Sequence, residues 1–172
     1  MAKVYFSTGS NQGDRLTMLV QAAKLIDKLI GKVILFSPVV ESEPWGFEAE
    51  TNFLNQVLMI ETQQSPEQVL NQILEIETKL GRKRSGKGYS SRNIDIDILF
   101  YDDKQVNESN LEVPHPLLHK RKFILQPLAD IAPELIHPVL QTTISELLSQ
   151  LNDKSKITIA VNKEEFTRLF IQ

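Results

Sequence analysis

The chain has 172 residues, 41% of them hydrophobic and 24% charged, with a formal net charge of −3 and no cysteine. This is the composition of a globular protein long enough for one domain that buries about 70% of its unfolded surface, which argues against disorder and a second full domain. The lack of cysteine excludes disulfides, thiolate metal sites and a cysteine nucleophile, so any metal must bind oxygen or imidazole.

The first residues pass directly into an apolar strand pattern at Val4-Tyr5-Phe6, without a charged leader or an apolar run of membrane length. A slightly negative chain is also unsuited to general nucleic-acid binding. We therefore expect a cytoplasmic protein that binds neither nucleic acid nor a membrane. We also expect a monomer, although no residue pattern indicates the oligomeric state. We expect a single domain over residues 1–172, with a common core to about residue 156 and an extension over about 157–172.

Hydrophobic spacing along the first hundred residues alternates between the periods of strands and helices. It predicts strands at 3–8, 32–43, 53–61 and 94–100, a helix from Asp14 to Gly31, and a helix from Ser65 to Gly81. The β-α-β-β-α-β order is that of the ferredoxin-like split βαβ core, an α+β fold with helices packed on one face of an antiparallel sheet. Downstream, the pattern predicts C-terminal helices and a possible extra strand at 157–161.

The most informative segment is the strand 94–98, in which isoleucine alternates with Asp95 and Asp97. Side chains two residues apart share one face of a strand, which places these Cα atoms about 6.5 Å apart. Two carboxylates at this separation can bridge divalent cations, as in sites that stabilise phosphoryl displacement. By itself the same alternation is also typical of a strand with one face in water.

A basic loop leads into this strand, because residues 82–92 contain five cations and no acid. Such loops are usually only solvated, but this one brings Arg92 within three residues of Asp95. Arginine matches phosphate oxygens in a bidentate way, and arginines together with metal ions are what phosphoryl transfer requires.

Further candidate ligand residues lie on other segments. An amide such as Asn55 on an apolar strand face is costly if buried without partners, and the edge of a heterocycle would satisfy it. The cationic run His119-Lys120-Arg121-Lys122 precedes Phe123 and follows His115, which lies between two prolines. Taken singly, these residues are more often solvated, structural or part of the core.

The ordered set of motifs over roughly residues 1–140 resembles the 6-hydroxymethyl-7,8-dihydropterin pyrophosphokinase family of folate biosynthesis. The matching motifs are Gly9-Ser10-Asn11, Pro44-x-Gly46, Phe53-Leu54-Asn55, Glu77 with Gly81-Arg82-x-Arg84, Arg92-x-Ile94-Asp95-Ile96-Asp97-Ile98, Val113-Pro114-His115, Arg121-x-Phe123 and Pro127-Leu128. The resemblance implies an Mg²⁺-dependent enzyme that transfers the β,γ-pyrophosphoryl group of ATP to the pterin hydroxymethyl oxygen and releases AMP.

The resemblance also implies a role for each matching residue. Asp95 and Asp97 would hold two Mg²⁺ ions, and Arg82 and Arg92 would attend the transferring group. ATP would contact Glu77, Arg84, Tyr89, Ile98, His115 and Arg121. The pterin would contact Ser42, Trp45, Phe53, Asn55 and Phe123.

The chain departs from the family pattern at several positions. Tyr89 stands where tryptophan is frequent, and some members carry polar, basic or aromatic ATP-contacting side chains at the positions of Leu74, Asn110, Glu112 and Pro116. Two other classes of function share parts of the pattern: a non-catalytic ferredoxin-like module that binds nucleotide or metal, and a two-metal nucleotidyltransferase that would release pyrophosphate.

Overall fold

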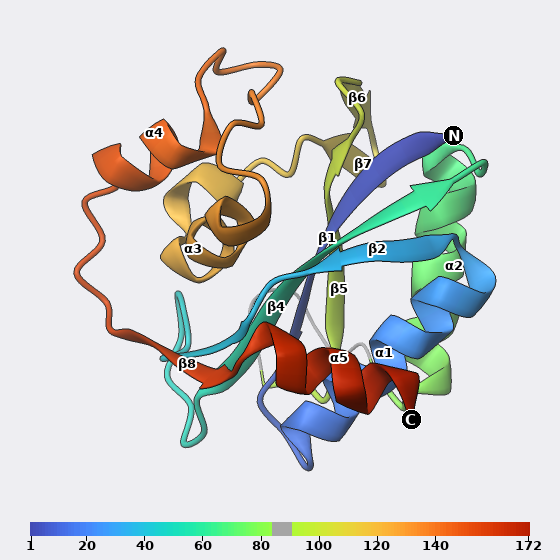
Figure 1. Cartoon of the computed structure of the whole chain (residues 1–172), viewed down its shortest axis with the longest axis vertical. Coiled ribbons are helices and arrows are strands. Elements are labelled where there is room, and N and C mark those ends of the chain that lie inside the picture. The colour runs from blue at the N-terminus through green and yellow to red at the C-terminus, as the bar shows by residue number, and fades with distance from the viewer. Residues whose placement is uncertain (84–90) are drawn as a thin grey trace.

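The computed structural model describes residues 1–83 and 91–172. Its centre is a six-stranded antiparallel sheet that carries helices on both faces (Figure 1). The strands are β1 Ala2–Ser10, β2 Lys32–Phe36, β3 Val39–Ser42, β4 Phe53–Thr62, β5 Asp95–Tyr101 and β8 Ile157–Val161, with a separate hairpin of β6 Val106–Glu108 and β7 Leu111–Val113. The helices are α1 Arg15–Leu29, α2 Pro66–Lys79, α3 Lys122–Ile131, α4 Ile144–Gln150 and α5 Lys163–Ile171, and a 3₁₀ turn spans Leu118–Lys120.

The strand order is β5-β1-β4-β3-β8, and β2 also pairs with β4. The predicted α+β class and antiparallel sheet are therefore confirmed, and β8 and α5 are the expected extra strand and helix. The segment predicted as one β-rich stretch is divided between β2 and β3 at Ser37-Pro38. Proline has no N–H for the ladder, and the Ser37 hydroxyl accepts a 2.9 Å hydrogen bond from the Val57 N–H across the break.

The two faces of the sheet bury different sets of side chains. Val4 and Phe6 of β1 contribute to the core under α1, α2 and α5, whereas Tyr5 contributes to the core under α3 and α4. The two helices of the β-α-β-β-α-β core do share one face, as predicted. The later helices α3 and α4 cover the opposite face (Figure 1).

Local signals begin the helices as the sequence indicates. The Asp14 carboxylate accepts a hydrogen bond from the Thr17 N–H, and Ser65 with Gln68 forms a reciprocal capping box. Thr143 with Glu146 forms a second one. Each interaction satisfies helix N–H groups that lack intrahelical partners.

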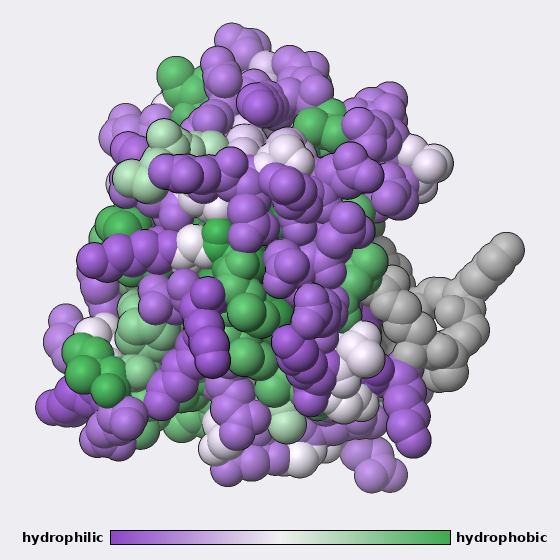
Figure 2. Space-filling model, turned by 90° about the vertical axis from the view of Figure 1, so that its right-hand side faces the viewer, coloured by the Kyte–Doolittle hydropathy of each residue, from purple (hydrophilic) through white to green (hydrophobic). Residues whose placement is uncertain are grey.

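Polar side chains cover most of the surface seen in Figure 2, with a strip of apolar side chains along its middle. That view is from the side of Figure 1 on which α1 and α2 lie. Among the described residues, no helix combines the length and apolar character that a membrane crossing requires.

Candidate active site

A cleft of about 640 Å³ opens where β1 separates β4 from β5. Gly9 of β1 pairs with Asn55 of β4 on one side and with Asp95 of β5 on the other. Neighbouring strands lie about 4.8 Å apart, so the backbones at Asn55 and Asp95 are about 10 Å apart across one strand. A Cβ atom on Gly9 would lie 2.8 Å from the Asn55 Oδ1 atom, which explains why glycine occupies the floor of the cleft.

The acidic face of β5 is turned into this cleft, as the alternation predicted. Asp95 and Asp97 line the cleft, and the alternate residues Ile94, Ile96 and Ile98 belong to the core under α1 and α2, where Ile96 and Ile98 also reach the wall of the cleft. Asp97 pairs with Ser7 of β1, two positions along the strands from the Gly9–Asp95 pair. The paired carboxylates are therefore held by a buried strand face on one side and are open to a ligand on the other.

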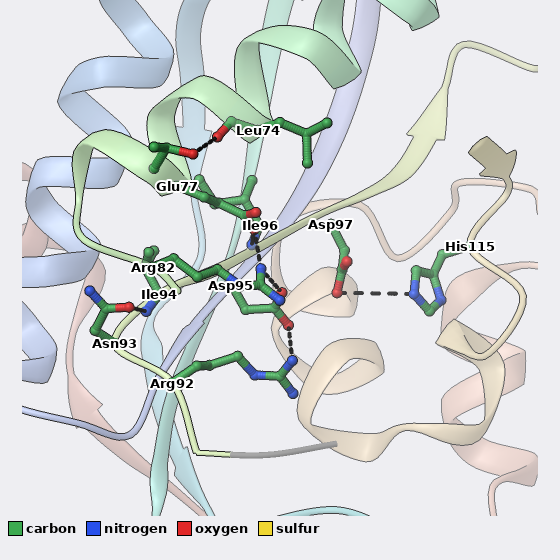
Figure 3. A network of polar contacts seen from close by, with 11 residues as sticks. Leu74, Glu77, Arg82, Arg92, Asn93, Ile94, Asp95, Ile96, Asp97 and His115 are labelled. Atoms are coloured by element: carbon green, nitrogen blue, oxygen red, sulfur yellow. Dashed lines mark hydrogen bonds and ion pairs between the residues drawn. The ribbon is translucent and has the colours of Figure 1, made fainter. Parts of the chain in front are cut away.

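Two arginines converge on Asp95 (Figure 3). Arg82 Nη1 donates a 2.8 Å hydrogen bond to Asp95 Oδ1, and Arg92 Nη1 lies 3.6 Å from Asp95 Oδ2. Arg82 also pairs with Glu77, whose side chain is almost fully buried. A phosphate group in this cleft would meet guanidinium groups that are already oriented by carboxylates.

Glu77 completes an otherwise open edge of the sheet. In the described part of the chain β5 lies at the edge of the sheet, so its outer N–H groups have no neighbouring strand there to bond. Glu77 projects from α2 and accepts a 2.9 Å hydrogen bond from the Ile96 N–H, in addition to its ion pair with Arg82. This carboxylate therefore fixes α2, the acidic strand and the start of the basic loop relative to one another.

In the described part of the site, the negative charge of Asp97 is less well neutralised by neighbouring arginines than that of Asp95. Its burial, and then the negative charge of Asp95, raise the pKa of Asp97 to about 7, although Arg121 and Arg92 act in the opposite direction. About a third of the side chain remains exposed to the cleft. A bound cation would offset the repulsion between the two carboxylates.

The donor set suits a magnesium ion that is shared with a substrate. Within residues 1–83 and 91–172, no group of three or more potential His, Cys, Asp or Glu ligands is assembled for a metal. Mg²⁺ is commonly held by only one or two carboxylates, with phosphate and water oxygens as its other ligands. Asp95 and Asp97 on one strand face therefore fit a metal that binds together with a phosphorylated ligand.

His115 faces Asp97 from the other side of the cleft, with 4.0 Å between Nε2 and Oδ2 (Figure 3). Its Nδ1 accepts a 3.1 Å hydrogen bond from the Leu117 N–H, which leaves the proton of the neutral ring on Nε2. Burial and the nearby Arg121 lower the pKa of His115 to about 4. His115 thus presents a neutral N–H donor to the cleft.

The lowered pKa of His115 predicts how its imidazole ring titrates. We expect the His115 ring to remain neutral down to roughly pH 5, because protonation would place a buried imidazolium beside Arg121. The stabilising contribution of His115 is then present above the unfolded pKa of about 6.5 and is lost as the pH falls through the folded pKa of about 4. NMR titration of the imidazole, assigned with His115→Gln, checks this; a midpoint near 6.5 would contradict it.

Aromatic rings and an amide form the other half of the cleft. Asn55 Nδ2 donates a 3.0 Å hydrogen bond to Ser42 Oγ, on a strand pair that also carries Phe53. The Trp45 and Phe123 rings line the same space. A flat heterocycle with an amide-like edge fits an amide that is fixed in this way between aromatic rings.

Most of the residues implied by the resemblance lie in this one cleft. Those lining it are Ser42, Trp45, Phe53, Asn55, Glu77, Arg82, Arg92, Asp95, Asp97, Ile98, His115, Arg121 and Phe123. Arg84 and Tyr89 lie outside the described residues. Leu74, Asn110, Glu112 and Pro116, where the chain departs from the family pattern, also line the cleft. Their roles toward a ligand stay predictions.

Asn11 is a residue to which the sequence assigned no role. Its Oδ1 accepts a 2.8 Å hydrogen bond from the Arg92 N–H, and its own N–H donates a 3.1 Å bond to the Arg92 carbonyl. Its Nδ2 donates to Ser91 Oγ at 3.1 Å and to the Thr51 carbonyl at 3.4 Å. Asn11 therefore holds Arg92 in place from the end of β1. Its position within the Gly9-Ser10-Asn11 motif was the only sequence signal.

We expect Asn11→Ala to lower kcat about tenfold with little change in nucleotide affinity, because it releases the backbone that orients Arg92. Loss of these partly buried hydrogen bonds should also cost about 1–3 kcal/mol of folding free energy. Steady-state kinetics with Arg92→Ala and the double variant provide the check. If Asn11 acts through Arg92, the substitution changes the rate little when Arg92 is already alanine. Fully additive losses would refute this role.

The site combines paired carboxylates, flanking arginines and a slot for a planar ligand on an antiparallel sheet. This is the arrangement of a phosphoryl-transfer enzyme with two substrates. Residues 5–133 match the model of the 7,8-dihydro-6-hydroxymethylpterin-pyrophosphokinase family. The chain belongs to this family. It is therefore a pyrophosphokinase of folate biosynthesis, and neither a non-catalytic module nor a nucleotidyltransferase is favoured.

Relatives from distant bacteria agree with this assignment. The chain is 41% identical over 146 residues to a 2-amino-4-hydroxy-6-hydroxymethyldihydropteridine pyrophosphokinase of Aquifex aeolicus, covering 85% of this chain and 90% of the relative. It is 41% identical over 145 residues to the Porphyromonas gingivalis protein of the same name, covering 83% of this chain and 98% of that protein.

Solved structures share the fold at low sequence identity. The Plasmodium falciparum HPPK-DHPS structure with pteroate matches with a TM-score of 0.73 and 19% identity. The match covers 87% of this chain but 44% of that one, so the chain spans less than half the length of this structural relative.

Proposed function

We propose that the protein transfers the β,γ-pyrophosphoryl group of ATP to the hydroxymethyl oxygen of 6-hydroxymethyl-7,8-dihydropterin, giving AMP and the pterin diphosphate. The observation that carries this proposal is the pairing of Gly9 with both Asn55 and Asp95, which joins a slot for a heterocycle to an acidic, arginine-flanked site within one cleft. We further propose that the protein acts as a monomer.

Asp95 and Asp97 would hold two Mg²⁺ ions, which neutralise charge on the phosphates when bound. Arg82 and Arg92 would bind the transferring pyrophosphoryl oxygens. Asp95 already holds both guanidinium groups at the edge of the acidic face, so little reorientation is required when the phosphates arrive. Guanidinium groups that meet charge mainly in the transition state increase the rate more than the affinity.

ATP would also contact Glu77, Ile98, His115 and Arg121. The neutral His115 can donate its Nε2–H to a phosphate or sugar oxygen, and it does so without adding a further positive charge beside Arg121. Arg84 and Tyr89 complete the proposed ATP contacts from the basic loop.

The pterin would bind with its amide-like edge on Asn55 and near Ser42, and with its ring between Phe53 and Phe123 beside Trp45. The Asn55 side chain is fixed by Ser42 and by the close approach of Gly9, so it offers a pre-oriented donor and acceptor. Orientation of the two substrates, together with charge neutralisation, provides the catalysis, and no side chain has to act as a strong base.

Product analysis tests the proposed function. Purified protein with ATP, Mg²⁺ and the hydroxymethyl pterin should form AMP and pterin diphosphate in equal amounts. Release of ADP would indicate transfer of a single phosphoryl group, and release of pyrophosphate would indicate nucleotidyl transfer. Binding of both ligands without turnover would support the non-catalytic module. Asp97→Asn under identical conditions is the matched control for contaminating ATPases.

A further inference from the structure

Arg121 lies between the two halves of the cleft and is held there by aromatic rings. Its Cζ atom is 4.8 Å from the centroid of the Trp45 ring and 5.8 Å from that of Phe123. The rings come from separate segments, since Trp45 follows β3 and Phe123 belongs to the first turn of α3. The Arg121 residue is only 7% exposed.

This contact is suited to fixing a cation. A guanidinium group over an aromatic face is attracted to the ring electrons, tryptophan is the strongest such partner, and exclusion of water strengthens the attraction. Arginine otherwise has many rotamers, and each one that is excluded before a ligand binds lowers the entropy cost of binding. The same pairing recurs beside it, where Arg92 Cζ lies 5.9 Å from the Phe53 ring centroid.

We propose that Trp45 is a positioning residue for the nucleotide half of the site, with its indole face holding the Arg121 guanidinium where the phosphates arrive. The inference rests on the proposed function and extends it, because there Trp45 serves only the pterin. In this role the indole contributes to ATP binding through Arg121 and without contact with the nucleotide. Phe123 packs beside the same guanidinium and completes the aromatic clamp.

Nucleotide affinity measured without pterin tests this role separately from pterin binding. The probe is Mg²⁺ with an ATP analogue that has a methylene bridge between the α and β phosphorus atoms, studied by calorimetry. Trp45→Leu keeps an apolar side chain but removes the aromatic face, and it should weaken binding about threefold to tenfold. Trp45→Phe keeps an aromatic face and should stay within about twofold of the parent protein.

The double variant with Arg121→Met shows whether the effect passes through the arginine. Trp45→Leu should have almost no further effect on nucleotide affinity once Arg121 is methionine. Equal losses in Trp45→Leu and Trp45→Phe, or an unchanged loss in the Arg121→Met background, would overturn the proposal. A purely structural role of Trp45 predicts the unchanged loss in the Arg121→Met background.

A second measurement needs no nucleotide. Trp45 is the only tryptophan, so protein fluorescence excited at the indole band reports on it alone. Arg121→Met should change the emission intensity of the free protein, whereas the control Lys122→Met should not, because Lys122 Nζ bonds to the Ser155 carbonyl. Unchanged emission in Arg121→Met would overturn the inference. Failure of the parent protein to bind the analogue would instead contradict the proposed function, and the emission result would still decide whether Trp45 holds Arg121.

Discussion

Replacing Asp97 by alanine should reduce turnover about a thousandfold or more, because a divalent ion contributes several kcal/mol to transition-state charge stabilisation and each 1.4 kcal/mol is tenfold. The fold should remain intact, since a third of the Asp97 side chain is exposed to the cleft and is not packed in the core. Rate assays across a magnesium titration, with circular dichroism of the same samples, measure both effects. Full activity in this variant would refute the metal assignment.

Asp95→Ala is the matched comparison for Asp97→Ala. It should abolish turnover as well, but it should also cost about 1–3 kcal/mol of folding free energy because Arg82 loses a partly buried partner.

The contribution of Asp97 to folding stability differs from that of Asp95, because it depends on pH in the opposite direction to that of an ordinary paired carboxylate. Its folded pKa of about 7 lies above the usual 3.8, so its contribution to stability is present below pH 4 and is lost as the pH rises through about 7. Above pH 7, Asp97→Ala should therefore be at least as stable as the parent protein in the absence of metal.

Replacing Arg92 by alanine should lower kcat about a hundredfold to a thousandfold while nucleotide affinity falls much less. The guanidinium lies 3.6 Å from Asp95, beside the proposed metal ligands, where charge on the transferring group changes most. Single-turnover kinetics separate the chemical step from binding. Arg92→Lys retains the charge but loses the bidentate geometry, so its rate should fall between those of the parent and the alanine variant. A loss of affinity with an unchanged chemical step would make Arg92 a binding residue only.

Local patterns account for the features that the sequence predicted well. The alternation of isoleucine and aspartate at 94–98 set which side chains of β5 face the core and which face the cleft, because the period of a strand is two. Capping residues such as Asp14 and Ser65 marked helix starts because their interactions span only three residues. The family motifs supplied the remaining candidate residues, most of which line the cleft.

The sequence patterns did not predict features that depend on contacts between distant segments. The hydrogen bonds of Asn11 to Arg92 join residues 81 positions apart, and no local pattern predicts them. The contact of Arg121 with Trp45 requires α3 to lie on the sheet face opposite α1 and α2. The split of one expected strand at Ser37-Pro38 had a local signal in Pro38, which has no N–H for the ladder. The hydrogen bond of the Val57 N–H to Ser37 across this break, however, exists only once β4 has paired.

The central claim is that the acidic face of β5 binds the metal that accompanies ATP. Anomalous diffraction from crystals grown with Mn²⁺, the methylene-bridged ATP analogue and the hydroxymethyl pterin tests it most directly. We expect two manganese peaks, each within coordination distance of an Asp95 or Asp97 oxygen and a phosphate oxygen, with the pterin ring beside Asn55. Manganese bound only to the phosphates, away from both carboxylates, would contradict it.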